Sequence, residues 1–540
     1  MISNDSHTIA FTEVDEANHP TATYVYSKTL EHLPRDKKKS RITGRVDVIH
    51  PSSKPHSWSL SSLSNLLIDV FLPSGYPHSV SNDYVSYQIF VGSPSLLYHK
   101  RRPRSYQRAE KSWDIFLDSL QAFSSSIAGL LSSRAVLQGV GVGNADASPT
   151  AALLLHILQD SSGRVATILF AHRVGTALEP ECKMYRLAAD VFNDAAMILD
   201  CLSPIIPAGV SRVTVLSTAG VLRALCGVAG GSSKASLSAH FSRWGNLAEV
   251  NAKDSSQETI ISLIGMLVGS FVVSRVTSYT STWILLVMLL TLHLSLNYAA
   301  VRSVQMTSLN RQRANIVFST LLDSDPDLDI DDVNLTLQAH TKPKQTNVTQ
   351  SKSQWHIPTP GQVSKQEKIF EADGVLRWIS SAASTQYKLG FCRIGVSLEQ
   401  FLAPSSSPHT ESGSLSTPIP MSWLFALFES EDYLLFLHHD CKLWNAKILL
   451  KTSSTTRSQL KAWMHALLAA RVLCLSAEKA EVQGDEAENE HIKDAISQTL
   501  TFLNSECRAG QYMSALTQAG WDINIAALET RSGRRVAYDY

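Results

Sequence analysis

The sequence has little charge, and the charge that it has is balanced. Charged residues make up 18% of the chain, against about 25% in ordinary soluble proteins. The 48 basic and 48 acidic residues cancel, so no excess of positive charge indicates a nucleic-acid partner. The deficit of charge falls mainly between residues 117 and 301. We therefore expect a long, weakly charged region and no binding of nucleic acid.

The sequence also lacks the motifs that are typical of several kinds of functional site. The seven cysteines stand far apart without a CxxC pair, which argues against a disulfide framework or a zinc site and favours reduced intracellular thiols. The polar, acidic N-terminus is unlike a signal or transit peptide. The GVGVG run at 139–143 lacks the GKS/T ending of a phosphate loop, and the acidic run at 323–334 lacks the glycine of a calcium loop. We predict no metal, no cofactor and no catalytic residue, and we favour a protein that is not an enzyme.

A nearly uncharged stretch does stand out between Thr259 and Val301, where Arg275 is the single formal charge. About 20 apolar residues of helix cross a hydrocarbon core of roughly 30 Å. The stretch holds about two such lengths, with polar residues gathered at 275–280. The pattern predicts a membrane hairpin of two helices hinged at that point.

Four more segments, at 122–143, 150–159, 163–171 and 209–231, are rich in Ala, Gly, Ser and Leu. Small residues let helix backbones approach closely, which is how helices associate in membranes. Two GxxxG steps, Gly227 to Gly231 and Gly265 to Gly269, fit that pattern. The alternative interpretation is a soluble helical bundle with tight packing.

The predicted fold is mainly α: a helical membrane-associated bundle with small-residue packing, plus a smaller C-terminal α+β module. The predicted divisions are a polar N-terminal region at 1–60, the helical domain at 61–320, an acidic and low-complexity linker at 321–368, and the module at 369–540. A hairpin is predicted from TATYVYSKTL and RITGRVDVI. In the module FCRIGVSL, DYLLFLHH and NAKILLKT predict strands, SQLKAWMHALLAARVL predicts an amphipathic helix, and the acidic tract at 476–490 predicts a solvated loop.

The segment ECKMYRLAADVFNDAAMILD is the most suggestive for chemistry. Neighbours three and four apart stack on a helix, so one face carries Lys183, Arg186, Asp190, and Asn193 or Asp194. This charged stripe predicts a polar cavity among apolar helices, where ionisable residues mark substrate or ion paths. The alternative is a surface helix with a weak Arg186–Asp190 pair.

A second candidate site precedes the hydrophobic hairpin, in NAKDSSQET. Lys253, Asp254 and Glu258 are predicted to cap the following helix and to lie at the membrane edge. The alternative is that they contribute to a binding site beside the charged stripe.

Five blocks between residues 71 and 304 stand in one order: FLPSGYPHSVSNDY, DSLQAFSSSIAGLLSSRAVLQGVGVG, ASPTAALLLHILQD, ECKMYRLAADVFNDAA and NAKDSSQET. In this order they resemble the root UV-B-sensitive (RUS) family. The resemblance implies a eukaryotic, membrane-associated helical protein with no agreed biochemical activity. Plant members are linked to UV-B responses, pyridoxal homeostasis and auxin transport, and act through contacts between family members. Residues 91–117 separate two blocks that adjoin in the family. This insert is interpreted either as a basic surface loop or as an unspliced intron in the gene model.

Three functions remain open on these grounds. The first is a membrane-resident adaptor, whose partners are the lipid bilayer and a family member or second copy. The second is a small-molecule transporter or cofactor-homeostasis carrier that uses the charged stripe, with a small-molecule ligand as partner. The third is a soluble cofactor-handling enzyme. Arginines after residue 301 favour an intracellular membrane with the C-terminal module in the cytosol.

Overall fold

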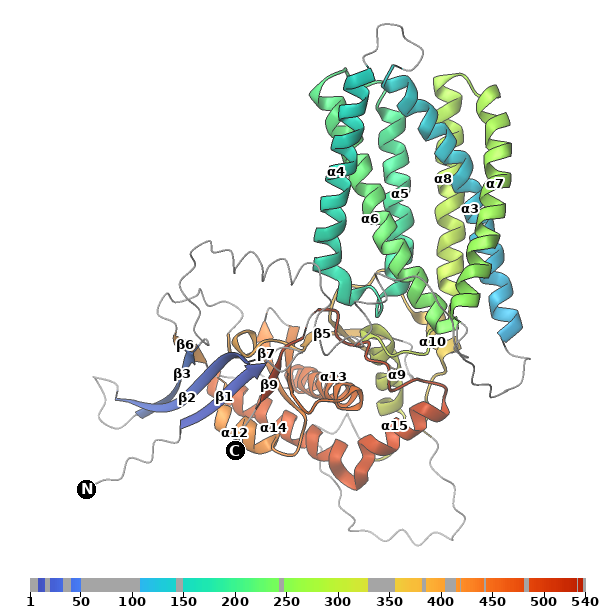
Figure 1. Cartoon of the computed structure of the whole chain (residues 1–540). Helices are drawn as coiled ribbons and strands as arrows, with labels where there is room; N and C mark the ends of the chain where they lie inside the picture. Colours follow the sequence, from blue (N-terminus) through green and yellow to red (C-terminus); the bar gives the residue numbers. More distant parts are fainter. Residues whose placement is uncertain are drawn as a thin grey trace, which may run out of the picture.

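The computed structural model describes residues 8–14, 20–32, 40–49, 107–141, 149–241, 247–328, 355–380, 385–403, 414–417, 419–440, 443–479, 485–531 and 533–537. A bundle of long helices stands on an α/β body (Figure 1). The block FLPSGYPHSVSNDY and residues 91–106 lie outside the described residues.

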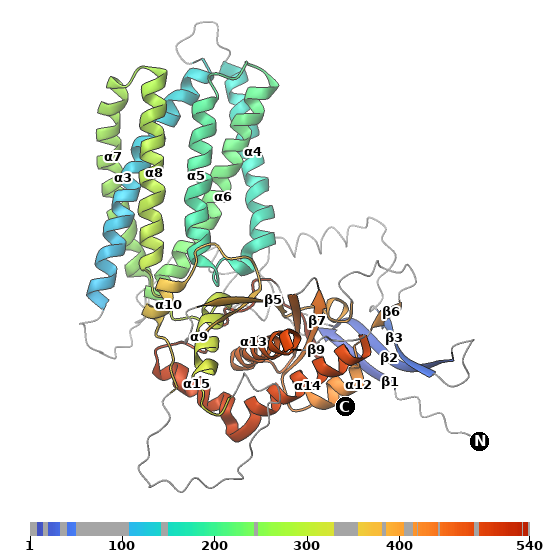
Figure 2. The ribbon, with the colours of Figure 1, turned by 180° about the vertical axis from the view of Figure 1, so that it is seen from behind.

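The bundle consists of α3 (Gln107–Gly139), α4 (Pro149–Val174), α5 (Cys182–Leu202), α6 (Val210–Phe241), α7 (Leu247–Arg275) and α8 (Tyr279–Ser303). Successive helices alternate in direction, as both views show (Figures 1 and 2). One end of the bundle, its base, lies against the body, and the other end is its tip. The predicted pair of helices with a turn at 275–280 is confirmed, because α7 ends at Arg275 and α8 begins at Tyr279.

The turn between α7 and α8 is held by an arginine from α3. Arg134 Nη1 donates to the Val273 carbonyl at 2.9 Å and to the Val276 carbonyl at 2.5 Å, and Nη2 donates to Thr282 Oγ1 at 2.9 Å. The last carbonyls of a helix have no partner within the helix. Arg134 therefore caps α7 at the tip, a role that the sequence did not reveal.

Small residues act differently in the two GxxxG steps. A Cβ on Gly265 would lie 2.8 Å from Ser126 Cβ, and one on Gly269 would lie 2.7 Å from a Leu130 methyl carbon. The first step is therefore confirmed as a close contact of α7 with α3. At Gly227 and Gly231 a Cβ would meet nothing within 4 Å. The second step therefore makes no close packing contact with the part of the chain that the structure describes.

The bundle exposes its apolar side chains. All but four of the large hydrophobic side chains exposed among the described residues belong to residues 137–298; the four others are Ile49, Phe370, Tyr387 and Ile525. Val210–His240 and Tyr279–Arg302 are long and apolar enough to cross a membrane, and the apolar part Ile261–Arg275 of α7 is shorter. Only 17% and 39% of the most apolar windows of the two long helices are buried, unlike the core helix of a soluble protein.

The body is built on one mixed sheet in the order β4-β5-β8-β9-β1-β2-β3-β6, with β7 also paired to β8. The strands are β1 (Thr8–Val14), β2 (Pro20–His32), β3 (Ser40–Ile49), β4 (Val375–Ile379), β5 (Gln386–Ile394), β6 (Ser414–Thr417), β7 (Tyr433–Asp440), β8 (Leu443–Lys451) and β9 (Arg535–Ala537). The predicted N-terminal hairpin is confirmed by the antiparallel pairing of β2 with β3. Because β1 pairs with β9, both ends of the chain share one sheet.

The body's helices are α9 (Arg311–Asp323), α10 (Pro360–Gln366), α11 (Leu398–Leu402), α12 (Met421–Leu427), α13 (Thr456–Lys479), α14 (Asp485–Asn504) and α15 (Arg508–Gln518), with two 3-10 turns, η1 (Gly175–Ala177) and η2 (Ser505–Cys507). The three strands and the amphipathic helix predicted for the module are confirmed as β5, β7, β8 and α13. The prediction of a solvated loop at 476–490 is wrong for its second part, because residues 485–490 begin α14. Acidic side chains stabilise the first turn of a helix, which explains why this tract is helical.

Segments on both sides of the predicted linker are built into the body. α9 is almost wholly buried, with Val317 and Phe318 at 0% exposed. Beyond it, Asp325 accepts from Arg508 Nη1 at 2.7 Å. The chain is described again from Trp355 and runs along the base of the bundle, where Glu367 is 5% exposed.

Candidate functional site

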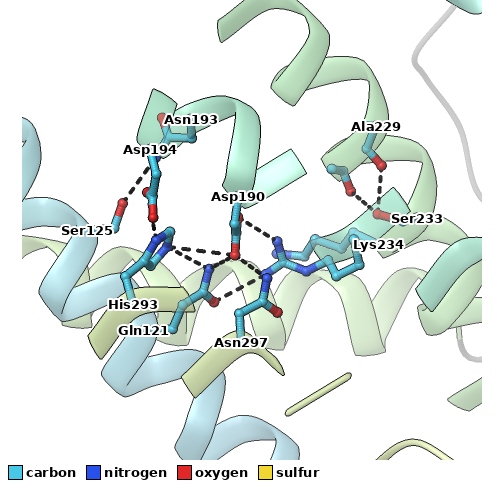
Figure 3. Close-up of polar contacts among 12 residues, drawn as sticks. Gln121, Ser125, Asp190, Asn193, Asp194, Ala229, Ser233, Lys234, His293 and Asn297 are labelled. Atoms are coloured by element: carbon cyan, nitrogen blue, oxygen red, sulfur yellow. Dashed lines mark hydrogen bonds and ion pairs between the residues drawn. The ribbon is translucent and has the colours of Figure 1, made fainter. Parts of the chain in front are cut away.

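A cluster of polar side chains lies inside the bundle, where α3, α5 and α8 meet (Figure 3). We call it the central cluster: Gln121, Arg186, Asp190, Asp194, His293 and Asn297. α3 supplies the glutamine, α5 the arginine and both aspartates, and α8 the histidine and asparagine. The cluster therefore joins three helices that are distant in sequence.

Asp190 is the acceptor at the centre. Its Oδ2 accepts hydrogen bonds from the side-chain amides of Gln121 and Asn297, and its Oδ1 lies 3.4 Å from Arg186 Nη1. The residue is 5% exposed. A buried carboxylate is tolerated only where such donors replace water, so the three helices together make this position stable.

His293 lies between Gln121 and Asp194. Gln121 Nε2, which donates to Asp190, also lies 3.0 Å from His293 Nε2. The other ring nitrogen, Nδ1, lies 2.8 Å from Asp194 Oδ1. Among the described residues Asp194 Oδ2 has no hydrogen-bond partner.

Apart from Arg186, whose side chain is 18% exposed, the residues of the central cluster are buried. Asp194 is 3% exposed, and His293 and Asn297 are each 1% exposed. A substrate could reach these groups only if the helices moved apart. In the described part of the chain, no group of three or more His, Cys, Asp or Glu side chains is arranged to hold a metal ion. As it stands, the arrangement locks three helices together around polar groups.

The predicted charged stripe is divided between two places. Arg186, Asp190 and Asp194 lie in the central cluster, whereas Lys183 lies at the base. There Lys183 Nζ is 2.7 Å from Glu367 Oε2, and Arg313 Nη1 is 2.7 Å from Glu367 Oε1. Burial alone would raise the pKa of the Glu367 carboxyl, but the two cations hold it below its usual value. Lys183 therefore ties the bundle to the body.

The remaining predicted residues have smaller roles. Asn193 Nδ2 makes a long 3.4 Å contact with Ser125 Oγ. Glu258 is exposed and pairs with Lys234 at 2.6 Å. The side chains of Lys253 and Asp254 lie outside the described residues. Because α7 begins at Leu247, the predicted cap at 253–258 is wrong: these residues lie within the helix.

The sequence analysis did not predict that Gln121, His293 and Asn297 belong to the cluster. The spacing of two of them could have indicated it, since His293 and Asn297 stand four apart in an apolar helix and therefore share one face. A second ion pair was missed near the tip, where the buried Asp200 accepts from the exposed Arg223 and from Ser132 Oγ. Arg223 and Asp200 come from neighbouring helices whose contact the sequence does not specify.

Comparison with known proteins gives a consistent result. Residues 57–99 and 111–325 match a family model described as a vitamin B6 photo-protection and homoeostasis domain. The chain is 34% identical to RUS family member 1 of Dictyostelium discoideum over 314 residues, which are 57% of this chain and 49% of that protein. It is 27% identical to root UVB sensitive 3 of Arabidopsis thaliana over 409 residues, 75% of this chain and 76% of that protein.

The matches differ in how much of each relative they cover. The chain aligns with about half of the Dictyostelium protein and with about three quarters of the Arabidopsis protein. No solved structure matches the chain. Matched residues 111–325 cover the bundle from the second turn of α3 to the end of α8, and also α9.

Proposed function

Because this chain belongs to the root UV-B-sensitive family, we propose that it is a membrane-resident adaptor. The bundle spans a bilayer and anchors the protein, and the body is held at one membrane face to engage protein partners. Family members or a second copy of the chain are the expected partners. The process served is vitamin B6 homoeostasis, for which the matching domain is described.

The observation that supports the membrane anchor is the inverted polarity of the bundle. Leu153, Leu267 and Ile284 are 58%, 66% and 66% exposed, while Asp190 and His293 are buried. In a bilayer every backbone group must be paired within the structure, and ionisable side chains face the bundle interior. A set of helices with apolar outer faces and with its ionisable side chains in the centre is what these requirements predict.

The observation that supports an adaptor is the firm attachment of the body. Beside the Lys183–Glu367–Arg313 set, Thr176 Oγ1 donates to the Thr530 carbonyl at 2.9 Å. Arg302 Nη2 donates to the Lys365 carbonyl at 2.8 Å. Ion pairs and hydrogen bonds on both sides of the junction hold the body in one orientation. Such an attachment suits a protein that presents a surface at a membrane.

Charges near the base favour a cytosolic position for the body. Arg173 lies in the last turn of α4 and Arg302 in the last turn of α8. Positively charged residues close to the ends of membrane helices tend to stay cytosolic. At the tip, Arg134 and Arg212 donate to backbone carbonyls of neighbouring turns, so there they serve as helix caps.

Membrane extraction tests the anchor. Full-length protein should remain in the pellet after washes with sodium carbonate or high salt and should be released by detergent. Protease added to the cytosolic side of sealed vesicles should then degrade the body and leave the bundle protected. Release by carbonate would refute the membrane anchor, and protection of the body without detergent would reverse the orientation.

A further inference from the structure

A cavity of about 230 Å³ lies where the base of the bundle meets the body. The end of α4, η1 and the start of α5 line it from the bundle. The start of α9 and the segments 371–375 and 530–531 line it from the body. We call it the junction cavity. Its polar lining includes Arg173, Glu181, Tyr185, Arg311, Asp373 and Arg531.

One of the three arginines is already engaged. Arg311 Nε donates to the Leu528 carbonyl at 2.7 Å, and its guanidinium also contacts Asp373 and Thr530 Oγ1. The acid Glu371 is likewise engaged, by Arg377 and Gln312. These pairs maintain the wall of the cavity and leave little charge for a ligand.

The other two arginines are exposed and less engaged. Arg173 is exposed and makes no ion pair or hydrogen bond with any residue that the structure describes. Arg531 is 65% exposed in its side chain and forms a long ion pair, at 3.7 Å, with the exposed Asp373. A Tyr185 hydroxyl in the same lining has no hydrogen-bond partner in the described chain. On the open side of the cavity, the hydrogen-bond donors of these three side chains therefore outnumber the acceptors that could bind them.

Glu181 adds little opposing charge. Its Oε2 accepts from Asn310 Nδ2 at 3.1 Å. Burial raises the pKa of the Glu181 carboxyl to about 7, although Arg313 and Arg311 oppose the shift, and Glu367 and Asp373 contribute to it. A carboxyl that is partly protonated near neutral pH repels an anion less than an ionised one.

From this arrangement we infer that the junction cavity binds a phosphate monoester through Arg173, Arg531 and Tyr185. Planar guanidinium groups match phosphate oxygens in paired, charge-assisted hydrogen bonds. The phosphate can come from a soluble ester or from a phospholipid headgroup. The lipid source rests on the proposed membrane anchor, because only then does the cavity lie at the level of the headgroups. The soluble source does not depend on the anchor.

Binding by the full-length, detergent-purified protein tests this inference. The probes are inorganic phosphate, followed by thermal unfolding, and vesicles of phosphatidylcholine with or without phosphatidic acid, followed by flotation. The double variant Arg173→Gln, Arg531→Gln should bind at least tenfold more weakly. Both side chains are exposed, so the fold should survive. Arg164→Gln, an exposed arginine on the same α4 outside the cavity lining, should bind like the wild type.

The outcomes distinguish a soluble phosphate from a lipid headgroup, and failure of the cavity inference from failure of the membrane anchor. A response to inorganic phosphate supports a soluble phosphate ligand, and a response to phosphatidic acid alone supports a lipid headgroup. No response to either probe, or equal binding by the double variant, would overturn the inference. Glu181→Gln provides a second readout, because loss of a negative charge should tighten binding at pH 8 but change little at pH 5. A protein that binds phosphate yet is released by carbonate would refute the anchor and leave the cavity intact.

Discussion

The bundle and the body place polar and apolar residues in opposite ways. In the body, Trp463, Leu467 and Leu434 are 0% exposed and belong to one large apolar core. In the bundle, Leu153 and Leu267 are 58% and 66% exposed, while polar side chains occupy the centre. Exposing one such side chain to water rather than burying it costs about 1.5–3 kcal/mol. The difference teaches that the two regions follow opposite rules for apolar side chains, as the proposed membrane anchor requires, and that the change occurs at the base of the bundle.

One exposed ion pair interrupts the apolar surface of the bundle. Arg164 Nε lies 2.9 Å from Asp160 Oδ2 on α4, and their side chains are 77% and 55% exposed. In water such a pair contributes about 0.3–0.5 kcal/mol. It provides a matched control for the buried charges of the central cluster, since Asp160 and Asp190 differ mainly in burial.

The largest effect is expected from Asp190→Asn. The substitution removes the negative charge that pairs with Arg186 at 3.4 Å, and it replaces one carboxylate oxygen with an NH2 donor among the Gln121 and Asn297 amides. Breaking a buried charged set costs about 3–5 kcal/mol, so the yield of folded protein and its stability in detergent should fall together. Asp160→Asn should cost about 0.5 kcal/mol or less. Equal effects of the two variants would show that Asp190 is not buried in a network, and that the polarity of the bundle is not inverted.

A slightly smaller effect is expected from Leu467→Ala in the body. Leu467 is 0% exposed in α13, and deleting such a side chain costs about 2–5 kcal/mol. Leu267→Ala on α7 removes a side chain that is 66% exposed and should cost about 0.5 kcal/mol or less in detergent. Chemical denaturation of the purified protein, followed by tryptophan fluorescence, measures both. A large loss for Leu267→Ala would mean that this surface of the bundle is covered within the protein.

Periodicity and composition predicted the local structure of both regions. The uncharged run with polar residues at 275–280 predicted α7 and α8, and the alternating TATYVYSKTL and RITGRVDVI predicted β2 and β3. These features depend on neighbours in sequence. The pairing of β1 with β9 and the burial of α9 depend on contacts between distant segments, which no local pattern specifies.

Only part of the candidate site could be predicted, because local patterns do not specify contacts between distant segments. Helical spacing brought Arg186, Asp190 and Asp194 together, because they lie on one helix. It also grouped Lys183 with them, although Lys183 pairs with Glu367 from a segment 184 residues away. Gln121 and His293 complete the network from α3 and α8, and only the packing of three helices brings them to Asp190.

An intermediate, pH-dependent effect is expected at the boundary, from Glu181→Gln. Burial raises the pKa of Glu181 from 4.5 to about 7, so the folded state holds this proton more tightly than the unfolded state does. The contribution to stability is complete below about pH 4.5 and is lost as pH rises through about 7. At pH 8 the variant should be more stable than the wild type by about 1–3 kcal/mol, with little difference at pH 4. Thermal unfolding across this range measures it, and the exposed Glu258→Gln is the control. A constant difference at all pH values would contradict the shift.

The smallest effects, of opposite sign, are expected from two glycines of the bundle. Gly265→Ala places a methyl group 2.8 Å from Ser126 Cβ, and overpacking of this kind costs about 1–3 kcal/mol. Gly227→Ala meets nothing within 4 Å and should gain about 0.5–1 kcal/mol from the higher helix propensity of alanine. Midpoints of thermal unfolding in detergent should therefore fall for the first variant and rise for the second. A rise for both would show that α7 does not pack closely on α3. A fall for Gly227→Ala would show that α6 uses its exposed glycines to contact a second molecule, which is where the adaptor proposed here would meet its partner.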